Sequence, residues 1–136
     1  MVEITILNRR SELGRVVTLL ERFGAEHHLA PQLVIDMQIA LDEVLSNVTQ
    51  YAHPDNAEHS IHVRLRMIDG VLEAQIEDDG LLFNPLLAPL PDLRARLRDR
   101  HVGGLGIEFV RKLMDDVTYE RTGERNRLVL RLRSES

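Results

Sequence analysis

The chain has 136 residues and a net charge of −5, and its length predicts a single domain spanning residues 1–136. The acidic charge argues against binding to nucleic-acid phosphates, and the absence of cysteine excludes disulfides and thiolate metal sites. The sequence shows neither a signal-peptide pattern nor an apolar run of membrane-spanning length, so we expect a cytoplasmic protein that does not enter a membrane.

The first third of the chain predicts one strand and two helices. Residues 2–7 alternate between apolar and polar side chains, as a strand does. Apolar residues then recur at helical spacing over 13–23, and Ser11 is suited to the N-cap of that helix. Pro31 is suited to the first position of a second helix, whose apolar stripe covers residues 34–48.

The middle of the chain predicts a β-hairpin. Residues 60–68 alternate cleanly, and Asp69-Gly70 is a strong signal for a two-residue hairpin turn. The returning strand places the apolar residues of 72–76 on one face, and Asp78 continues the same parity. We therefore expect Asp78 to point toward the apolar side, where a carboxylate is costly without a partner.

The last third predicts a long loop, a helix and two strands. Residues 81–102 hold three prolines and an arginine-rich polar run that can include a short helix, and we expect a lid or binding loop there. A helix should run from about 104 to 115. Strands are expected at 117–121 and 128–133, with a turn over 122–126.

The expected order of elements is strand, two helices, two strands, lid, helix and two strands. Strands joined by hairpins, with helices grouped between them, predict an α+β fold. Specifically, we expect a two-layer α/β sandwich with a mostly antiparallel mixed sheet and the helices on one face.

Glu43 and Asn47 lie one helical turn apart in ALDEVLSNVTQYAH and therefore share a helix face. An amide oxygen is a suitable ligand for Mg²⁺, which binds phosphates with few protein ligands. Glu43 beside a γ-phosphate would be placed to accept a proton from an attacking hydroxyl. Taken alone, the same pair is also typical of a solvated polar face.

Asp78 and Gly80 end the strand in AQIEDDGLLFNP. A carboxylate here is able to accept a hydrogen bond from an exocyclic amine such as that of adenine. A glycine beside it lets a base approach the backbone closely. The alternative is an ordinary turn, since Asp-Asp-Gly is common turn chemistry.

Gly103, Gly104 and Gly106 precede an apolar helix, and a glycine-lined helix start is an anion site. A hinge at the end of a loop is the alternative. The chain has neither a GxxxxGK[ST] phosphate loop nor GxGxxG after a strand, so any nucleotide site is of another kind. The lid arginines, Arg100 among them, are expected to be solvated. The alternative is that one of them reaches the γ-phosphate when the lid closes.

In this order, ExxxN on a helix, DxG after a strand, a long lid and GGLG opening a helix resemble the GHKL (Bergerat-fold) ATPases. ALDEVLSNVTQYAHPD, IEDDGLLFNP and GGLGIEFVRKLMDDVTYERTGERNRLVLRL are similar to bacterial anti-sigma factor serine/threonine kinases. The resemblance covers residues 2–133. It implies a histidine-kinase-like ATPase fold that binds ATP and Mg²⁺.

The resemblance also implies roles for single residues. Asn47 would bind Mg²⁺, Glu43 would be the general base toward a serine hydroxyl, and Asp78, with Gly80 beside it, would hold the adenine amine. The glycines at 103, 104 and 106 would receive the phosphates. The substrate would be an anti-anti-sigma (STAS) protein and a sigma factor would be sequestered. Members of this family commonly form homodimers.

The sequence departs from the family pattern at three positions: Gln50, Leu82 and Val102. Val102 stands where some of these kinases carry an arginine that meets the γ-phosphate, so Arg100 or another lid arginine would replace it. The alternative is a partner-switching binding module without catalysis, in which ATP is only a conformational ligand. A third reading is ATP hydrolysis without transfer to a protein.

Overall fold

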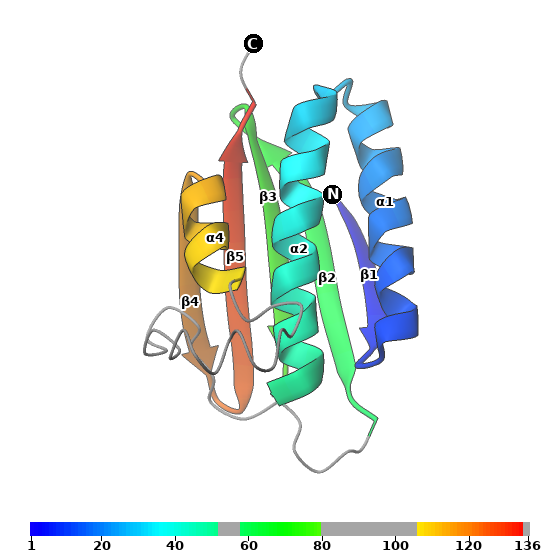
Figure 1. The fold of residues 1–136 in the computed structure, drawn as a ribbon, viewed down its shortest axis with the longest axis vertical. Coiled ribbons are helices and arrows are strands. Elements are labelled where there is room, and N and C mark those ends of the chain that lie inside the picture. Colours follow the sequence, from blue (N-terminus) through cyan, green and yellow to red (C-terminus); the bar gives the residue numbers. More distant parts are fainter. Residues whose placement is uncertain (52–57, 80–105, 135–136) are drawn as a thin grey trace, which may run out of the picture.

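The computed structural model describes residues 1–51, 58–79 and 106–134 (Figure 1). The strands are β1 (Val2–Leu7), β2 (Ser60–Ile68), β3 (Val71–Asp78), β4 (Asp116–Thr122) and β5 (Arg125–Arg133). The helices are the 3-10 helix η1 (Arg10–Glu12) and the α-helices α1 (Leu13–Glu26), α2 (Pro31–Tyr51) and α4 (Gly106–Leu113).

The five strands form one sheet in the order β1-β2-β3-β5-β4, and all four pairings between them are antiparallel. The hairpin between β2 and β3 turns at Asp69 and Gly70, whose φ angles are 50° and 78°. Positive φ at both central residues is the turn geometry that matches the twist of paired strands. The predicted hairpin is therefore confirmed.

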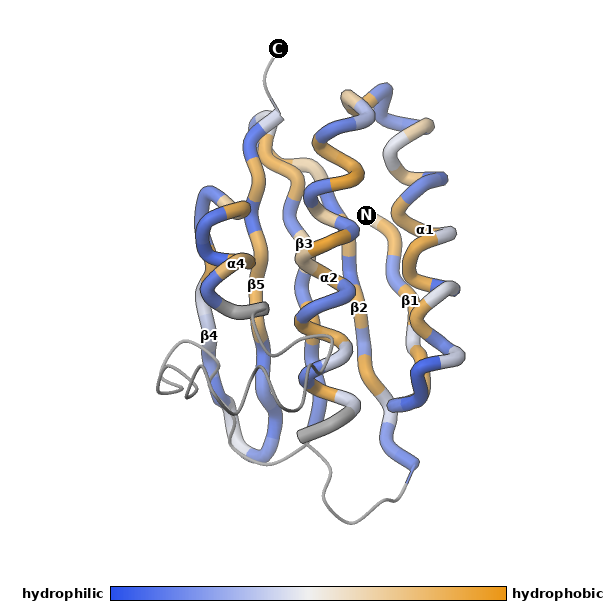
Figure 2. The backbone as a smooth tube through the Cα atoms, viewed as in Figure 1, coloured by the Kyte–Doolittle hydropathy of each residue, from blue (hydrophilic) through white to orange (hydrophobic). Residues whose placement is uncertain are grey.

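Helices α1, α2 and α4 lie on one face of the sheet (Figure 1). The predicted α+β fold, with two layers and helices on one side, is confirmed. Hydrophobic and hydrophilic residues alternate along the strands (Figure 2), because successive side chains point to opposite faces. The buried rows of β2 and β3 that face the helices are aliphatic: Ile61, Val63, Leu65, Leu72, Ala74 and Ile76.

The start of α1 differs from the prediction. Ser11 lies inside η1, and Glu12 occupies the N-cap of α1 without a side-chain cap bond. The Glu12 carboxylate instead accepts a hydrogen bond from the backbone N–H of Leu7, at 3.2 Å. The polar residue thus ties the helix start to β1, and Ser11 as the N-cap was wrong.

The turn before β5 is shorter than the predicted 122–126. Only residues 123 and 124 form the turn, because Arg121 pairs with Asn126 and Thr122 pairs with Arg125 across the two strands. Gly123 has a φ of 62°, which glycine adopts without strain. Asn126 is therefore a strand residue, and its side chain falls on the same face as Leu128.

The sheet face opposite the helices is polar, and its centre is an ion cluster. Glu73 on β3 is 3% exposed and accepts hydrogen bonds from Arg66 at 2.6 Å and Arg131 at 3.0 Å. Gln75 donates a further bond to the same carboxylate at 2.9 Å. Burial alone would raise the pKa of Glu73, but these bonds lower it to about 2.

Candidate functional site

The predicted site segments converge at one end of the molecule. In Figure 1, α2 and β3 both run toward the lower end, and α4 begins on its lower side. Glu43 and Asn47 lie in the second half of α2, Asp78 is the last residue of β3, and Gly106 is the first residue of α4. Helix α2 also packs against α4. The fold therefore brings together three segments that are far apart in the sequence.

Glu43 has an unusual environment for a carboxylate. Its side chain is half-buried, and its Oε2 is buried without a hydrogen-bond partner among the described residues. Burial raises the pKa of Glu43, and the charge of the neighbouring Asp42 raises it further. A carboxylate with a raised pKa is a stronger proton acceptor. A buried oxygen without a hydrogen-bond partner costs folding free energy, so its presence in a folded protein points to a functional role.

Asp42 was not singled out from the sequence. It is half-buried beside Glu43, and burial raises its own pKa as well. The adjacent acidic pair in LDEV was the available signal, because two neighbouring carboxylates on a helix that packs into the core disfavour each other's ionisation. Asp42 thus belongs to the electrostatic environment of Glu43.

Asn47 is 6% exposed, although asparagine is mostly a surface residue. It stands one turn beyond Glu43, so the two side chains share one face of α2, as the spacing predicted. Among the described residues, no cluster of three or more His, Asp or Glu side chains is placed to hold a metal. One amide oxygen fits Mg²⁺ only where phosphates and water supply most of the ligands, as Mg²⁺ commonly requires.

Asp78 points inward, as its strand parity predicted, and is 4% exposed. It has a protein partner that the sequence analysis missed: Asn126 on β5 donates from Nδ2 to Asp78 Oδ1 at 3.1 Å. The two residues are directly opposite each other in the β3–β5 register. Parity was the available signal here too, because Asn126 continues the inward row of Leu128 and Leu130.

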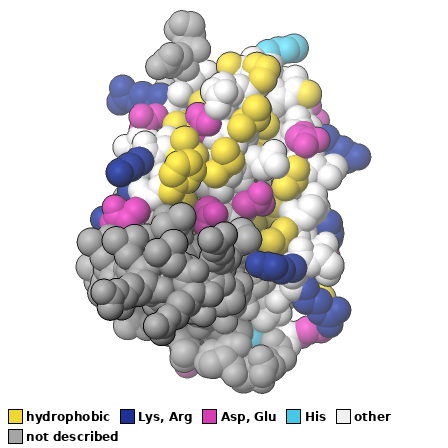
Figure 3. Space-filling view, in the orientation of Figure 1, with side chains coloured by type: hydrophobic (Ala, Val, Ile, Leu, Met, Phe, Trp, Pro, Cys, Tyr) yellow, Lys and Arg dark blue, Asp and Glu magenta, His cyan; other side chains and the backbone are white. Residues whose placement is uncertain are grey.

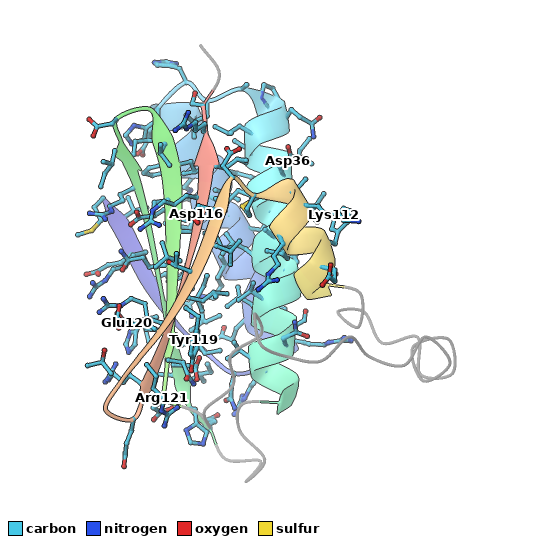
Figure 4. All side chains as sticks on the ribbon, turned by 90° about the vertical axis from the view of Figure 1, so that its left-hand side faces the viewer. Asp36, Lys112, Asp116, Tyr119, Glu120 and Arg121 are labelled. Atoms are coloured by element: carbon cyan, nitrogen blue, oxygen red, sulfur yellow. The ribbon has the colours of Figure 1, made fainter. Side chains whose placement is uncertain are left out.

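Asn126 is itself held by two residues of β4. The hydroxyl of Tyr119 donates to Asn126 Oδ1, and Nη1 of Arg121 donates to the same oxygen at 3.0 Å. Figure 4 shows Tyr119 and Arg121 on β4, toward the end of the sheet at which α2 ends. Four side chains from three strands therefore form one polar network beneath the end of β3.

The remaining predicted residues lie outside the described part of the chain. These are Gly80, Gly103, Gly104, Arg100 and the whole proposed lid at 81–102. Gly106 is described as the start of α4. The described structure thus covers four of the predicted positions: Glu43, Asn47, Asp78 and Gly106.

The helix layer carries exposed hydrophobic side chains (Figure 3). Ile35 and Ile39 on α2 and Phe109 on α4 are exposed, on two helices that pack against each other. None of the described helices is both long and apolar enough to cross a membrane.

Comparison with known proteins gives one family match and two similar curated proteins. The model of the histidine kinase-like ATPase domain matches residues 7–132. The chain is 28% identical over 111 residues to the serine/threonine-protein kinase BtrW of Bordetella bronchiseptica, which covers 82% of this chain and 78% of that protein. It is 26% identical over 98 residues to the serine-protein kinase RsbW of Listeria innocua, covering 63% of this chain and 57% of that protein.

Two solved structures share the fold. One holds the RsbU and RsbW domains of a Mycobacterium tuberculosis protein, with a TM-score of 0.65 and 16% identity over 98% of this chain and 31% of that chain. The other is a SiaB–SiaC complex from Pseudomonas aeruginosa, with a TM-score of 0.61 and 16% identity over 97% of this chain and 89% of that chain.

Proposed function

The chain belongs to the histidine kinase-like ATPase family, and from this premise we propose that it is an ATP-dependent serine/threonine protein kinase. The observation that carries the proposal is Glu43. Its carboxyl group has a raised pKa and a buried oxygen that lacks a hydrogen-bond partner among residues 1–51, 58–79 and 106–134, one helical turn from the buried amide of Asn47. This is the arrangement that a proton acceptor beside a metal-bound phosphate requires.

The proposed nucleotide site is formed by the three converging segments. Asp78 accepts a hydrogen bond from the adenine amine, with Gly80 beside it. Asn47 contributes its oxygen to Mg²⁺, which neutralises phosphate charge when bound. The glycines at 103, 104 and 106 would receive the phosphates through their backbone N–H groups, and Arg100 would meet the γ-phosphate.

In the proposed reaction, a serine or threonine hydroxyl oxygen attacks the γ-phosphorus. A new P–O bond forms, the bond from the γ-phosphorus to the bridging oxygen of ADP breaks, and Glu43 takes the hydroxyl proton. Burial of Glu43 makes this proton transfer more favourable, because it raises the pKa of the carboxyl toward the working pH. Most of the rate enhancement comes from positioning and charge neutralisation, as is general for phosphoryl transfer.

We propose a protein substrate of the anti-anti-sigma (STAS) class and a sigma factor as the sequestered partner. The similar proteins BtrW and RsbW are named as kinases of serine or serine and threonine, and the SiaB–SiaC structure shows a protein of this fold in a complex. The exposed Ile35, Ile39 and Phe109 also suit a protein partner. Because sigma factors act in the cytoplasm, such a partner would place the protein there. We also propose that the chain acts as one domain, and that it forms the homodimer common in the resembling family.

The alternative is a binding module that uses ATP only as a conformational ligand. The departures at Gln50, Leu82 and Val102 favour it, because each falls beside one of the three motifs of the proposed nucleotide site. In this case the protein would capture its partner only when ATP is bound, and no phosphate would be transferred to that partner.

The test compares the unmodified protein with Glu43→Gln and with Asp36→Asn as a matched control. Asp36 lies two turns earlier on α2 and accepts a bond from Gln32 at 2.7 Å. Labelled ATP is supplied with purified STAS proteins of the same organism, and ATP affinity is measured by calorimetry. A kinase predicts that Glu43→Gln binds ATP but transfers at least about 100-fold less phosphate, while Asp36→Asn stays active. ATP-dependent capture without any labelled partner would favour the binding module.

A further inference from the structure

The Asp78 carboxylate is held by a network that no sequence motif indicated. We infer that Asn126, fixed by Tyr119 and Arg121, is a positioning residue that aims Asp78 at the amine of adenine and so sets the preference for ATP over GTP. This inference rests on the proposed function, since it assumes that Asp78 faces the base.

The orientation of the Asn126 amide is determined by its partners. Its oxygen accepts hydrogen bonds from the Tyr119 hydroxyl and from Nη1 of Arg121, the latter at 3.0 Å, and the Arg121 guanidinium is able only to donate. The amide nitrogen must therefore face the other way, toward Asp78, where Nδ2 lies 3.1 Å from Oδ1. A flipped amide would place its oxygen against the Asp78 carboxylate and its nitrogen against the Arg121 guanidinium, and neither pair forms a hydrogen bond.

A fixed donor at Oδ1 restricts what Asp78 can do. The hydrogen bond from Asn126 Nδ2 limits rotation of the Asp78 carboxylate, so the lone pairs of this carboxylate keep a fixed orientation. Both residues are 4% exposed, so water is largely excluded from competing with this bond. A carboxylate that is acceptor-only suits the amino group of adenine, whereas guanine presents a carbonyl oxygen at the same ring position. Loss of this hydrogen bond should therefore reduce the preference for ATP over GTP more than it reduces the stability of the fold.

Arg121 adds charge to the network. A guanidinium donor polarises the amide whose oxygen it contacts, and this strengthens the bond that the amide nitrogen makes to Asp78. The chain of contacts runs from β4 through β5 to β3, so the base-binding carboxylate is braced by three adjacent strands.

The test measures ATP and GTP affinity by calorimetry for the unmodified protein, Asn126→Leu and Tyr119→Phe. Leucine is close to asparagine in shape but makes none of its hydrogen bonds. The matched control is Gln75→Leu, which removes an amide-to-carboxylate bond of 2.9 Å on the opposite face of the same sheet. Tyr119→Phe removes only one hydroxyl and covers the case in which Asn126→Leu does not fold.

We expect Asn126→Leu to weaken ATP binding about 10-fold and GTP binding about 2-fold or less, so that the preference for ATP narrows. Tyr119→Phe should narrow the preference by about 3-fold, and Gln75→Leu should leave it unchanged. An unchanged preference in both site variants, with Asp78→Asn abolishing it, would overturn this inference alone. Absence of ATP binding by the unmodified protein would overturn the inference together with the proposed function.

Discussion

Gly24 of α1 faces Val34 of α2 so closely that a Cβ atom at position 24 would lie 2.6 Å from Cγ2 of Val34. Glycine is thus required here for its missing side chain, and Leu29 fixes the same corner by donating its N–H to the Gly24 carbonyl at 2.9 Å. The contact sets how closely the helix that carries Glu43 and Asn47 approaches α1.

We therefore predict that Gly24→Ala lowers the free energy of unfolding by about 1–3 kcal/mol, because valine is stiff at χ1 and cannot easily move aside. The control is Gly14→Ala on the exposed side of α1, where a Cβ meets nothing within 4 Å. It should be neutral or stabilising by about 0.5 kcal/mol. Urea unfolding of both variants checks this, and equal effects would contradict the close approach.

Glu73 should make stability depend on acid pH. Its folded pKa of about 2 lies below the ordinary value of 4.5, so its contribution is present above 4.5 and is lost as the pH falls toward 2. We predict that Glu73→Gln costs on the order of 2 kcal/mol at pH 7 and progressively less below pH 4.5.

The check is urea unfolding of the unmodified protein and Glu73→Gln at several values between pH 7 and pH 3. Glu120→Gln, an exposed carboxylate on the same sheet face, is the matched control. Parallel stability curves for the unmodified protein and Glu73→Gln would show that the ion cluster does not hold its charge in the folded state.

Glu43 should contribute to the pH dependence of stability with the opposite sign from Glu73. Because burial raises its folded pKa, the stabilising contribution of its protonated form exists at low pH and is lost as the pH rises through that pKa. We predict that Glu43→Gln raises the free energy of unfolding at pH 7 by about 0.5–1 kcal/mol, and that the gain disappears at low pH. A destabilised Glu43→Gln in thermal or urea unfolding would mean that the charge has a partner.

Asn47 should matter to nucleotide binding only when magnesium is present. We predict that Asn47→Ala abolishes the Mg²⁺-dependent part of ATP binding, because it removes the amide oxygen proposed for the metal. Gln32→Ala, near the start of the same helix, is the control and should bind normally. Calorimetry with and without Mg²⁺ distinguishes the variants, and an unchanged affinity of Asn47→Ala would exclude the metal role.

Periodicity was sufficient for the layers and for the inward direction of Asp78. The alternation at 60–68, the Asp69-Gly70 turn and the helical stripe of α2 predicted elements that the structure confirms. The alternation of side chains along β3 alone predicted that Asp78 points toward the apolar side, and the low exposure of Asp78 agrees with this prediction. These patterns succeed because they depend on which side chains are buried, and burial repeats with the geometry of the element.

Cross-strand partners were the part that the sequence could not supply. Asn126 was assigned to a turn, because asparagine beside glycine is typical of turns and the register of β4 on β5 was unknown. Ser11 was assigned to a cap for a similar reason, since local chemistry favours serine there but η1 occupies the position. The contact that outweighs the local preference is distant for Asn126, whose partner is Asp78, and local for Ser11, where Glu12 bonds to Leu7.

The two halves of the candidate site are built on separate parts of the fold. Glu43 and Asn47 project from one helix, where residues four apart are separated by about 5–6 Å whatever the sheet does. Asp78, Asn126 and Tyr119 belong to the sheet alone. In the proposed function, changes to the strands would alter which base is accepted, while the spacing between Glu43 and Asn47 on the helix would stay the same. Nucleotide preference and phosphate transfer would then be open to separate variation and separate engineering.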